Sequence, residues 1–224
     1  MSVHEIRKTL IQLGEDARKM RWSRELRSLS SLVNETTTAK DFFFEFWCYL
    51  ATVKTIHKEV GKVNLELPSG QSHAVWPLKP GSPSNFSYFS FHVAKTSYGI
   101  YPGVKFMYKG IDSSFAPDIS IRSVLGKSSE AKIYAVWDAK YRDKPSKQIT
   151  RDEVYTFSTA RGLLPISQSA SLKIKLAGIA HSCCFHSCGL ISNGNFSSEK
   201  DQTLKALGLR ETARFGTATQ LTRP

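Results

Sequence analysis

The chain has 224 residues, with 31 Lys and Arg against 19 Asp and Glu, which gives a formal net charge of +12 and a pI near 9.6. With 41% hydrophobic and 22% charged residues, the composition is typical of a globular protein and argues against a disordered or fibrous chain. No stretch approaches the ~20 apolar residues of a membrane-spanning helix, and residues 1–19 lack the apolar region of a secretory signal. The positive surplus points to a polyanionic partner, although ordinary enzymes can also be basic.

The cysteines indicate the cellular compartment. Three of the four cysteines fall between residues 183 and 188, which is not the spacing of a disulfide framework. We therefore expect a reducing, cytoplasmic setting.

The first expected element is a helix over residues 4–33. Apolar residues recur at three- and four-residue steps from Ile6 to Met20, and basic residues crowd its second half. This pattern fits either a solvated helix with one apolar stripe or a basic arm that lies along DNA. We treat residues 1–38 as an N-terminal basic helical arm.

A second helix is expected to begin near Ala39 and to be buried, because residues 41–60 are apolar on most sides. Glu45 is a carboxylate among the aromatic residues of this helix. It fits either a functional acid or the polar edge of a partly exposed helix. The Pro, Gly and Ser of residues 68–85 then predict a loop.

Strands are expected next, at Tyr88–Thr96, Gly103–Tyr108, Asp118–Leu125 and Ala131–Tyr141. The last two would form a hairpin through the loop at residues 126–130. Further along, a helix is expected over Thr150–Arg161, with Thr150 and Glu153 in capping-box spacing. Another strand is expected at Leu172–Ser182.

After residue 193 the chain is polar, and only a short helical piece is expected there, at Glu199–Leu207. The whole order of elements predicts an α/β domain with a mixed sheet. We place its core at residues 39–192 and a polar C-terminal extension at residues 193–224.

Three polar residues of the expected hairpin are candidates for a catalytic site. Asp118 opens one strand and Asp138 lies near the end of the next, so an antiparallel register brings them side by side. Lys140 is two residues beyond Asp138 and shares its strand face. Two carboxylates and a cation in one place suit a phosphodiester hydrolase, which needs oxygen ligands for Mg²⁺ and a positive charge beside the attacking water. Glu45 is a candidate third carboxylate.

These residues resemble a known superfamily. Pro117-Asp118 followed by Asp138-Ala139-Lys140 is similar to the PD-(D/E)XK signature of restriction-endonuclease-like nucleases, and the order of elements is similar to their αβββαβ core. The runs at residues 44–47, 138–142 and 151–155 further resemble the nuclease components of methylcytosine-dependent restriction systems. The resemblance covers about residues 40–185. The chain lacks a G-x-x-x-x-G-K-[ST] phosphate-binding loop, so any NTPase would be a separate subunit.

The resemblance implies a role for each matching residue. Asp118 and Asp138 would hold Mg²⁺, or Mn²⁺ in its place, with the backbone carbonyl of Ala139. Lys140 would orient the attacking water and stabilise charge on the phosphate. Glu45 would ligate a second ion directly or through water. A further set of candidates for contacting nucleic acid comprises Tyr141, Arg142, Lys144 and Arg151.

We therefore expect a Mg²⁺-dependent endonuclease that hydrolyses DNA, in restriction, defence or mobile-element processing. Its expected partners are DNA, a separate NTPase or specificity subunit, and a second copy of the chain, since a double-strand break needs two sites. The basic residues from Arg122 and Lys132 to Arg151 would hold the substrate. RNA as the substrate stays open, because no 2′-hydroxyl reader is evident.

Other interpretations remain open. Asp138 and Lys140 could form an ordinary surface ion pair, and the fold could then serve as a non-catalytic nucleic-acid-binding or assembly subunit. The run from His181 to Cys188 contains five potential zinc ligands, but it lacks paired C-x-x-C spacing. It equally fits a buried strand and loop, in which cysteine acts as a small apolar residue.

Overall fold

The computed structural model describes residue 8 and residues 40–77, 80–108, 112–124, 132–144, 146–167, 188–215 and 221–223. Within these residues, one mixed sheet has the strand order β1-β2-β3-β6-β7-β8-β9-β10. The strands are β1 (Asn64–Glu66), β2 (Tyr88–Val93), β3 (Thr96–Pro102), β6 (Ile119–Ser123), β7 (Ile133–Lys140), β8 (Gly189–Ser192), β9 (Arg210–Ala213) and β10 (Leu221–Arg223).

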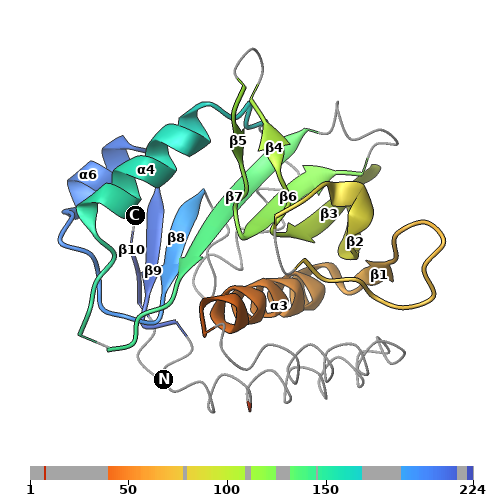
Figure 1. Ribbon diagram of the computed structural model, residues 1–224, viewed down its shortest axis with the longest axis horizontal. Coiled ribbons are helices and arrows are strands. Elements are labelled where there is room, and N and C mark those ends of the chain that lie inside the picture. Colours follow the sequence, from red (N-terminus) through yellow and green to blue (C-terminus); the bar gives the residue numbers. More distant parts are fainter. Residues whose placement is uncertain are drawn as a thin grey trace.

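Helices cover both faces of this sheet. Helix α3 (Lys40–Val60) crosses one face, and α4 (Arg151–Gly162) and α6 (Asp201–Ala206) lie over the other (Figure 1). A short 3-10 turn, η1 (Pro83–Asn85), precedes β2, and a separate hairpin consists of β4 (Phe106–Met107) and β5 (Ser114–Phe115). The expected α/β class, with a mixed sheet between helices, is confirmed. None of the helices in the described ranges is long and apolar enough to cross a membrane.

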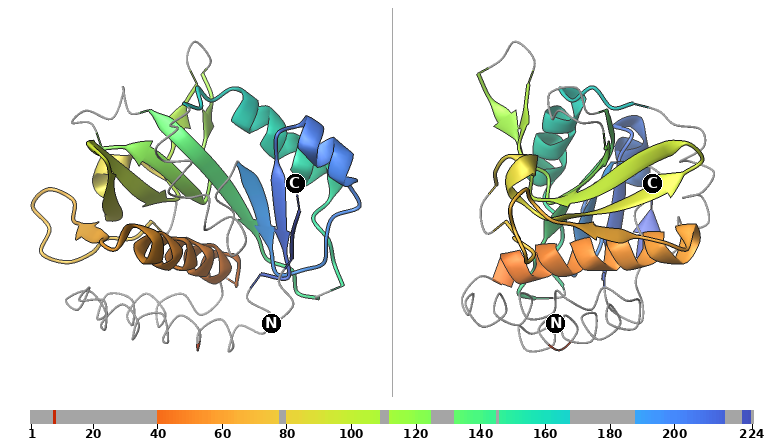
Figure 2. Two further views of the ribbon diagram at one scale, coloured as in Figure 1. Left: turned by 180° about the vertical axis from the view of Figure 1, so that it is seen from behind. Right: turned by 90° about the vertical axis from the view of Figure 1, so that its right-hand side faces the viewer.

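Two hydrophobic clusters form on the two faces of the sheet. Helix α3 is buried, as expected, because its aromatic residues pack against the sheet beside Trp137 and Ala139. Val136 belongs instead to the second cluster, which includes Val154 and Phe157 of α4. Side chains in β7 thus alternate between the faces near its end. Figure 2 shows from two further sides that α3 lies on one face of the sheet and α4 and α6 on the other.

The end of β7 lies near the middle of the sheet. Strand β7 pairs with β6 in the antiparallel sense and with β8 in the parallel sense. Helix α4 follows, and its N-terminus carries the expected capping box: Thr150 accepts from the Glu153 backbone N–H, and the Glu153 carboxylate accepts from the Thr150 N–H at 2.7 Å. The cap fixes where the helix begins after β7.

Two sequence expectations are wrong. A strand was expected at Gly103–Tyr108, but residues 106–107 form only the two-residue β4. The full strand is β3, which follows β2 after a tight turn at Ala94-Lys95. Ala94 has φ +53°, a conformation that a sequence signals only when glycine stands there.

The short helix expected at Glu199–Leu207 is present as α6 (Asp201–Ala206). The expectation of a polar extension outside the core is wrong, because β9 extends the sheet by parallel pairing with β8. Glu211 is buried in β9, where its carboxylate accepts from the backbone N–H and hydroxyl of Ser197 at 2.6 and 2.8 Å. Because these bonds satisfy the charge inside the sheet, a polar sequence forms a buried strand here.

Three expectations lie outside the described residues. They are the N-terminal arm apart from Lys8, the strand at Leu172–Ser182, and the His181–Cys188 cluster apart from Cys188. Cys188 is buried with a free thiol at the start of β8.

Candidate active site

The start of β6 meets the end of β7 at the candidate site. Ile119 pairs with Trp137, so the antiparallel register places the preceding Asp118 beside the following Asp138. The Asp118 Oδ2 accepts a hydrogen bond from the backbone N–H of Ala139 at 2.6 Å. The convergence expected from the hairpin is therefore present in the structure.

Asp138 and Lys140 form an ion pair, with 2.7 Å between Lys140 Nζ and Asp138 Oδ2. The Asp138 side chain is only 15% exposed and that of Lys140 is 33% exposed. An ordinary surface pair would be more solvated than this. The pair is instead partly enclosed, at the same strand ends as Asp118.

Glu45 approaches this site from α3, the helix that packs on β7. Burial raises the pKa of its carboxyl to about 7, with a further contribution from the charge of Asp138 and an opposing one from Lys140. A pKa near neutrality allows this carboxyl to exchange a proton at physiological pH. Glu45 is therefore not a solvated helix edge.

The other two ionisable groups are also perturbed. Burial raises the pKa of Asp118 well above its usual range, and the negative charges of Asp138 and Glu45 raise it further. For Lys140, desolvation lowers the pKa, but the nearby carboxylates, Asp138 foremost, outweigh it and the net shift is upward. Lys140 accordingly stays protonated at neutral pH. It can donate hydrogen bonds and stabilise negative charge, but it cannot serve as a base.

Oxygen donors of this kind fit a hard divalent cation. Within the ranges that the structure describes, no three His, Cys, Asp or Glu side chains are grouped so that they could hold a metal ion by themselves. Mg²⁺, however, keeps several waters and usually takes one or two carboxylates. Asp118 and Asp138 supply two, and a cation between them relieves their mutual repulsion, which adds to burial in raising the pKa of Asp118. The donor set thus fits Mg²⁺ or Mn²⁺.

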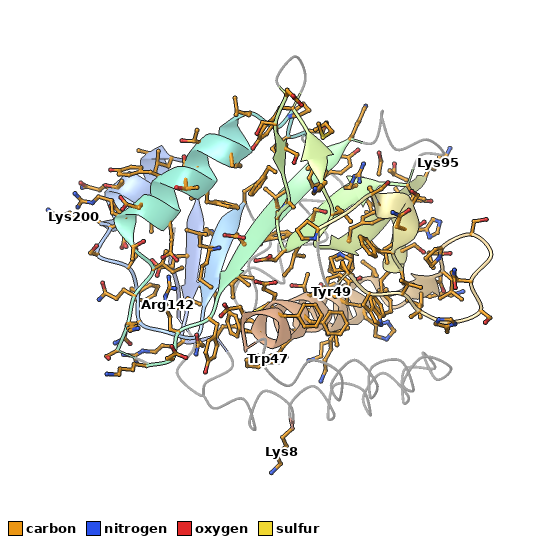
Figure 3. The ribbon with its side chains drawn as sticks, viewed as in Figure 1. Lys8, Trp47, Tyr49, Lys95, Arg142 and Lys200 are labelled. Carbon is orange, nitrogen blue, oxygen red and sulfur yellow. The ribbon has the colours of Figure 1, made fainter. Side chains whose placement is uncertain are left out.

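Two of the expected nucleic-acid contacts have internal partners. The Tyr141 ring packs 6.0 Å from that of Phe44 on α3. Arg142 is paired with Glu153 of the capping box, and its backbone is held by the Asn193 side chain, which accepts from the Arg142 N–H at 2.6 Å and donates to its carbonyl at 2.9 Å. Figure 3 shows Arg142 where the chain leaves β7 towards α4.

The remaining basic candidates differ in position. Lys144 is exposed on the loop after β7, and Arg151 is exposed although it pairs with Glu199 at 2.6 Å. Arg122, expected to hold substrate, is instead 4% exposed and stacks over the rings of Tyr101 and Phe106. Lys132 precedes β7, and six residues of extended chain place it about 20 Å from Asp138.

A pocket beside the carboxyl groups was not anticipated from the sequence. Glu45 and Asp118 both line it, together with aromatic side chains of α3 and three prolines. The available signal was the spacing of Phe42, Glu45, Phe46 and Tyr49, which places them on one helical face. The sequence does not indicate which residues lie opposite this helical face, because they come from other segments of the chain.

Comparison with known proteins adds little. No protein-family model matches the chain, and no curated protein is detectably similar to it. Among solved structures, the crystal structure of a protein of unknown function, AF1548, aligns with a TM-score of 0.35 and 10% identity. The alignment covers 55% of this chain and 53% of that chain, so the present chain spans about half the length of that protein. A TM-score this low does not establish a shared fold.

Proposed function

We propose that the chain is a Mg²⁺-dependent endonuclease that hydrolyses DNA phosphodiester bonds at the site formed by Glu45, Asp118, Asp138 and Lys140. The observation that carries this proposal is the placement of Asp118, Asp138 and Lys140, all partly buried, at the ends of β6 and β7, with the perturbed carboxyl of Glu45 approaching from α3. Such a cluster destabilises the empty fold, because like charges repel and each is partly desolvated. Perturbed groups of this kind gather at functional sites.

Each residue has a distinct task in this proposal. Asp118 and Asp138, with the carbonyl of Ala139, hold the cation, which polarises the phosphate and makes its bound water more acidic. Lys140, protonated at neutral pH, donates to the phosphate and stabilises the charge that develops there. The Glu45 carboxylate, with a pKa of about 7, takes up the proton released by the attacking water.

DNA is the proposed substrate because the chain carries a net charge of +12. Lys144 and Arg151, both exposed near the chain's exit from β7, are the described basic residues best placed to hold phosphates. Restriction or defence is the setting that the PD-(D/E)XK resemblance implies. A separate NTPase or specificity subunit and a dimer for double-strand cleavage belong to the same proposal.

The test is cleavage of supercoiled plasmid by the purified full chain. We expect nicking that requires Mg²⁺ or Mn²⁺ and stops with EDTA. Asp138→Asn and Lys140→Ala should each lower the rate at least about 100-fold, because they remove a cation ligand and a charge-stabilising donor. The matched control is Asp112→Asn, which changes an exposed aspartate before β5 and should leave the rate unchanged.

The alternative is a non-catalytic nucleic-acid-binding or assembly subunit. The Asp138–Lys140 ion pair is the observation that favours it, because a purely structural pair would look similar. In that case DNA binding would persist in Asp138→Asn, and no divalent cation would produce cleavage. Equal cleavage by the parent and the two site variants would also remove the proposed assignment.

A further inference from the structure

The pocket beside Asp118 has two walls of different origin. One wall is a single face of α3, where Phe42, Glu45, Phe46 and Tyr49 follow one another at steps of three and four residues. The other comes from the end of β3 and the segment before β6, and includes Pro102 and Ala116. Two carboxyl residues of the proposed site, Glu45 and Asp118, belong to this lining.

The pocket suits a flat, uncharged ring rather than a phosphate. Pro77, Pro80 and Pro102 line it, and among the residues that the structure describes no lysine or arginine does so. The two carboxyl residues in its lining repel an anion but can accept hydrogen bonds from ring N–H groups or amines. A nucleobase has both features, since it offers a π-face and N–H donors, and its own phosphate would remain outside beside Lys140.

The aromatic wall presents the half-buried ring of Phe42 for stacking, with the buried side chains of Phe46 and Tyr49 beside it. The rings of Phe42 and Phe46 are nearly parallel, with centroids 6.0 Å apart and an interplanar angle of 9°. Phe46 is fixed in turn by an edge contact with Trp76, and the Tyr49 hydroxyl donates to the carbonyl of Ile100 at 3.0 Å. Figure 3 shows Tyr49 on the side of α3 that is turned towards the sheet. Phe42 is the half-buried ring of this row.

The far wall is held by backbone. Gly103 has φ +48°, a conformation that glycine adopts without strain, and its N–H donates to the carbonyl of Asp118 at 3.0 Å. This bond connects the end of β3 to Asp118, one of the carboxyl residues of the proposed site. The pocket and the proposed cation site are thus fixed relative to each other.

We propose that this pocket binds an unpaired nucleobase next to the scissile phosphate. The inference rests on the proposed function and names its substrate class: DNA with an unstacked nucleotide, as in a bulge, mismatch or single-stranded end. A base in continuous duplex must first leave its stack, which costs free energy, whereas an unpaired base enters without that cost.

The test compares the affinities of the full chain for three fluorescein-labelled duplexes by anisotropy, with Ca²⁺ in place of Mg²⁺. One duplex carries a bulged adenosine, the second carries an abasic bulge at the same place, and the third is uninterrupted. We expect the adenosine bulge to bind about tenfold more tightly than the abasic bulge, because only it presents a base for stacking. The abasic bulge controls for the flexibility of the backbone.

Two variants test whether the base binds in this pocket. Phe42→Leu keeps apolar volume but removes the π-face, and Ala116→Trp fills the pocket without removing packing. Each should bring the ratio of the two bulge affinities close to one. Tyr155→Ala, which removes a 45% exposed aromatic side chain on α4, should keep the full ratio. Circular dichroism melting confirms that each variant is folded.

Each outcome bears on one claim. Equal affinity for the adenosine and abasic bulges in the parent chain overturns the pocket assignment, even if the protein cleaves DNA. Retention of the preference in both Phe42→Leu and Ala116→Trp also overturns it, because the base would then bind elsewhere. A base preference without cleavage under any divalent cation leaves the pocket in place and contradicts the proposed nuclease activity.

Discussion

At the scale of single residues, the Glu45 carboxyl is an example of a candidate site residue whose charge lowers the stability of the fold. Its carboxyl has a pKa of about 7 in the fold against an ordinary value of 4.5. Between these values the folded chain binds more protons at this group than the unfolded chain does. The Glu45 contribution to stability is therefore best at acid pH and is lost as the pH rises from about 4.5 through 7.

This decrease of stability with rising pH leads to a prediction for Glu45→Gln. Without divalent cations, the variant should be more stable than the parent at pH 8 by about 1–2 kcal/mol, allowing for the partial exposure of the site. At pH 5 the difference should shrink towards zero. Urea unfolding at the two pH values measures it, with Glu59→Gln as the control for an exposed glutamate on the same helix.

A variant that is less stable than the parent by the same amount at both pH values would contradict this prediction. Glu45 would then act through packing or a hydrogen bond and not through its charge. The predicted outcome would instead identify a carboxylate that destabilises the empty fold, which is expected of a group retained for binding or catalysis.

At the scale of elements, the segment from β7 to α4 determines what surrounds Lys140. Three separate contacts hold this segment: the Arg142–Glu153 ion pair, the Asn193 side chain on the Arg142 backbone, and the bond from the Asn195 N–H to the Lys147 carbonyl at 3.0 Å. Two of the three reach it from the residues just after β8. The end of β8 therefore fixes the loop that leaves the candidate site.

Gly194 is the point where these segments are closest. A Cβ atom at this position would lie 2.1 Å from the Lys147 carbonyl oxygen, so Gly194→Ala must displace backbone. We expect a loss of about 1–3 kcal/mol in the free energy of unfolding. Gly162→Ala at the end of α4 is the control, because no atom lies within 4 Å of its added Cβ and stability should change little.

Thermal and urea unfolding of both variants measure this difference. If Gly194→Ala were as stable as the parent, the loop would not be held against β8 in the way the structure describes. Tm values of the two glycine variants should therefore separate clearly, with only Gly194→Ala below the parent.

The same elements show what a sequence can predict here. Asp118, Asp138 and Lys140 follow from local rules, because an antiparallel hairpin with period-two alternation places them together. Thr150 and Glu153 follow from capping chemistry. The position of Glu45 depends on how α3 packs across the sheet, and no local rule gives that. The sequence does not predict strand β9, because the burial of Glu211 depends on hydrogen bonds from Ser197, and no local pattern indicates them.

At the scale of the whole molecule, exposed basic residues lie on the segment that leaves the acidic candidate site. The described acids of the site are partly buried, whereas Lys144 and Arg151 are exposed on the surface. Arg122 does not contribute to that surface, since it is buried among aromatic rings. A net charge of +12 favours binding of a polyanion, and the proposal that this partner is hydrolysed rests on the partly buried carboxyl groups.

The most direct test of the central claim is a crystal structure of the full chain soaked in Mn²⁺, examined by anomalous scattering. We predict one anomalous peak between Asp118 and Asp138, in contact with the Ala139 carbonyl and beside Glu45, and its loss in crystals of Asp138→Asn. An ordered parent crystal with no Mn²⁺ at these carboxylates, and with the Asp138–Lys140 ion pair unchanged, would contradict the account.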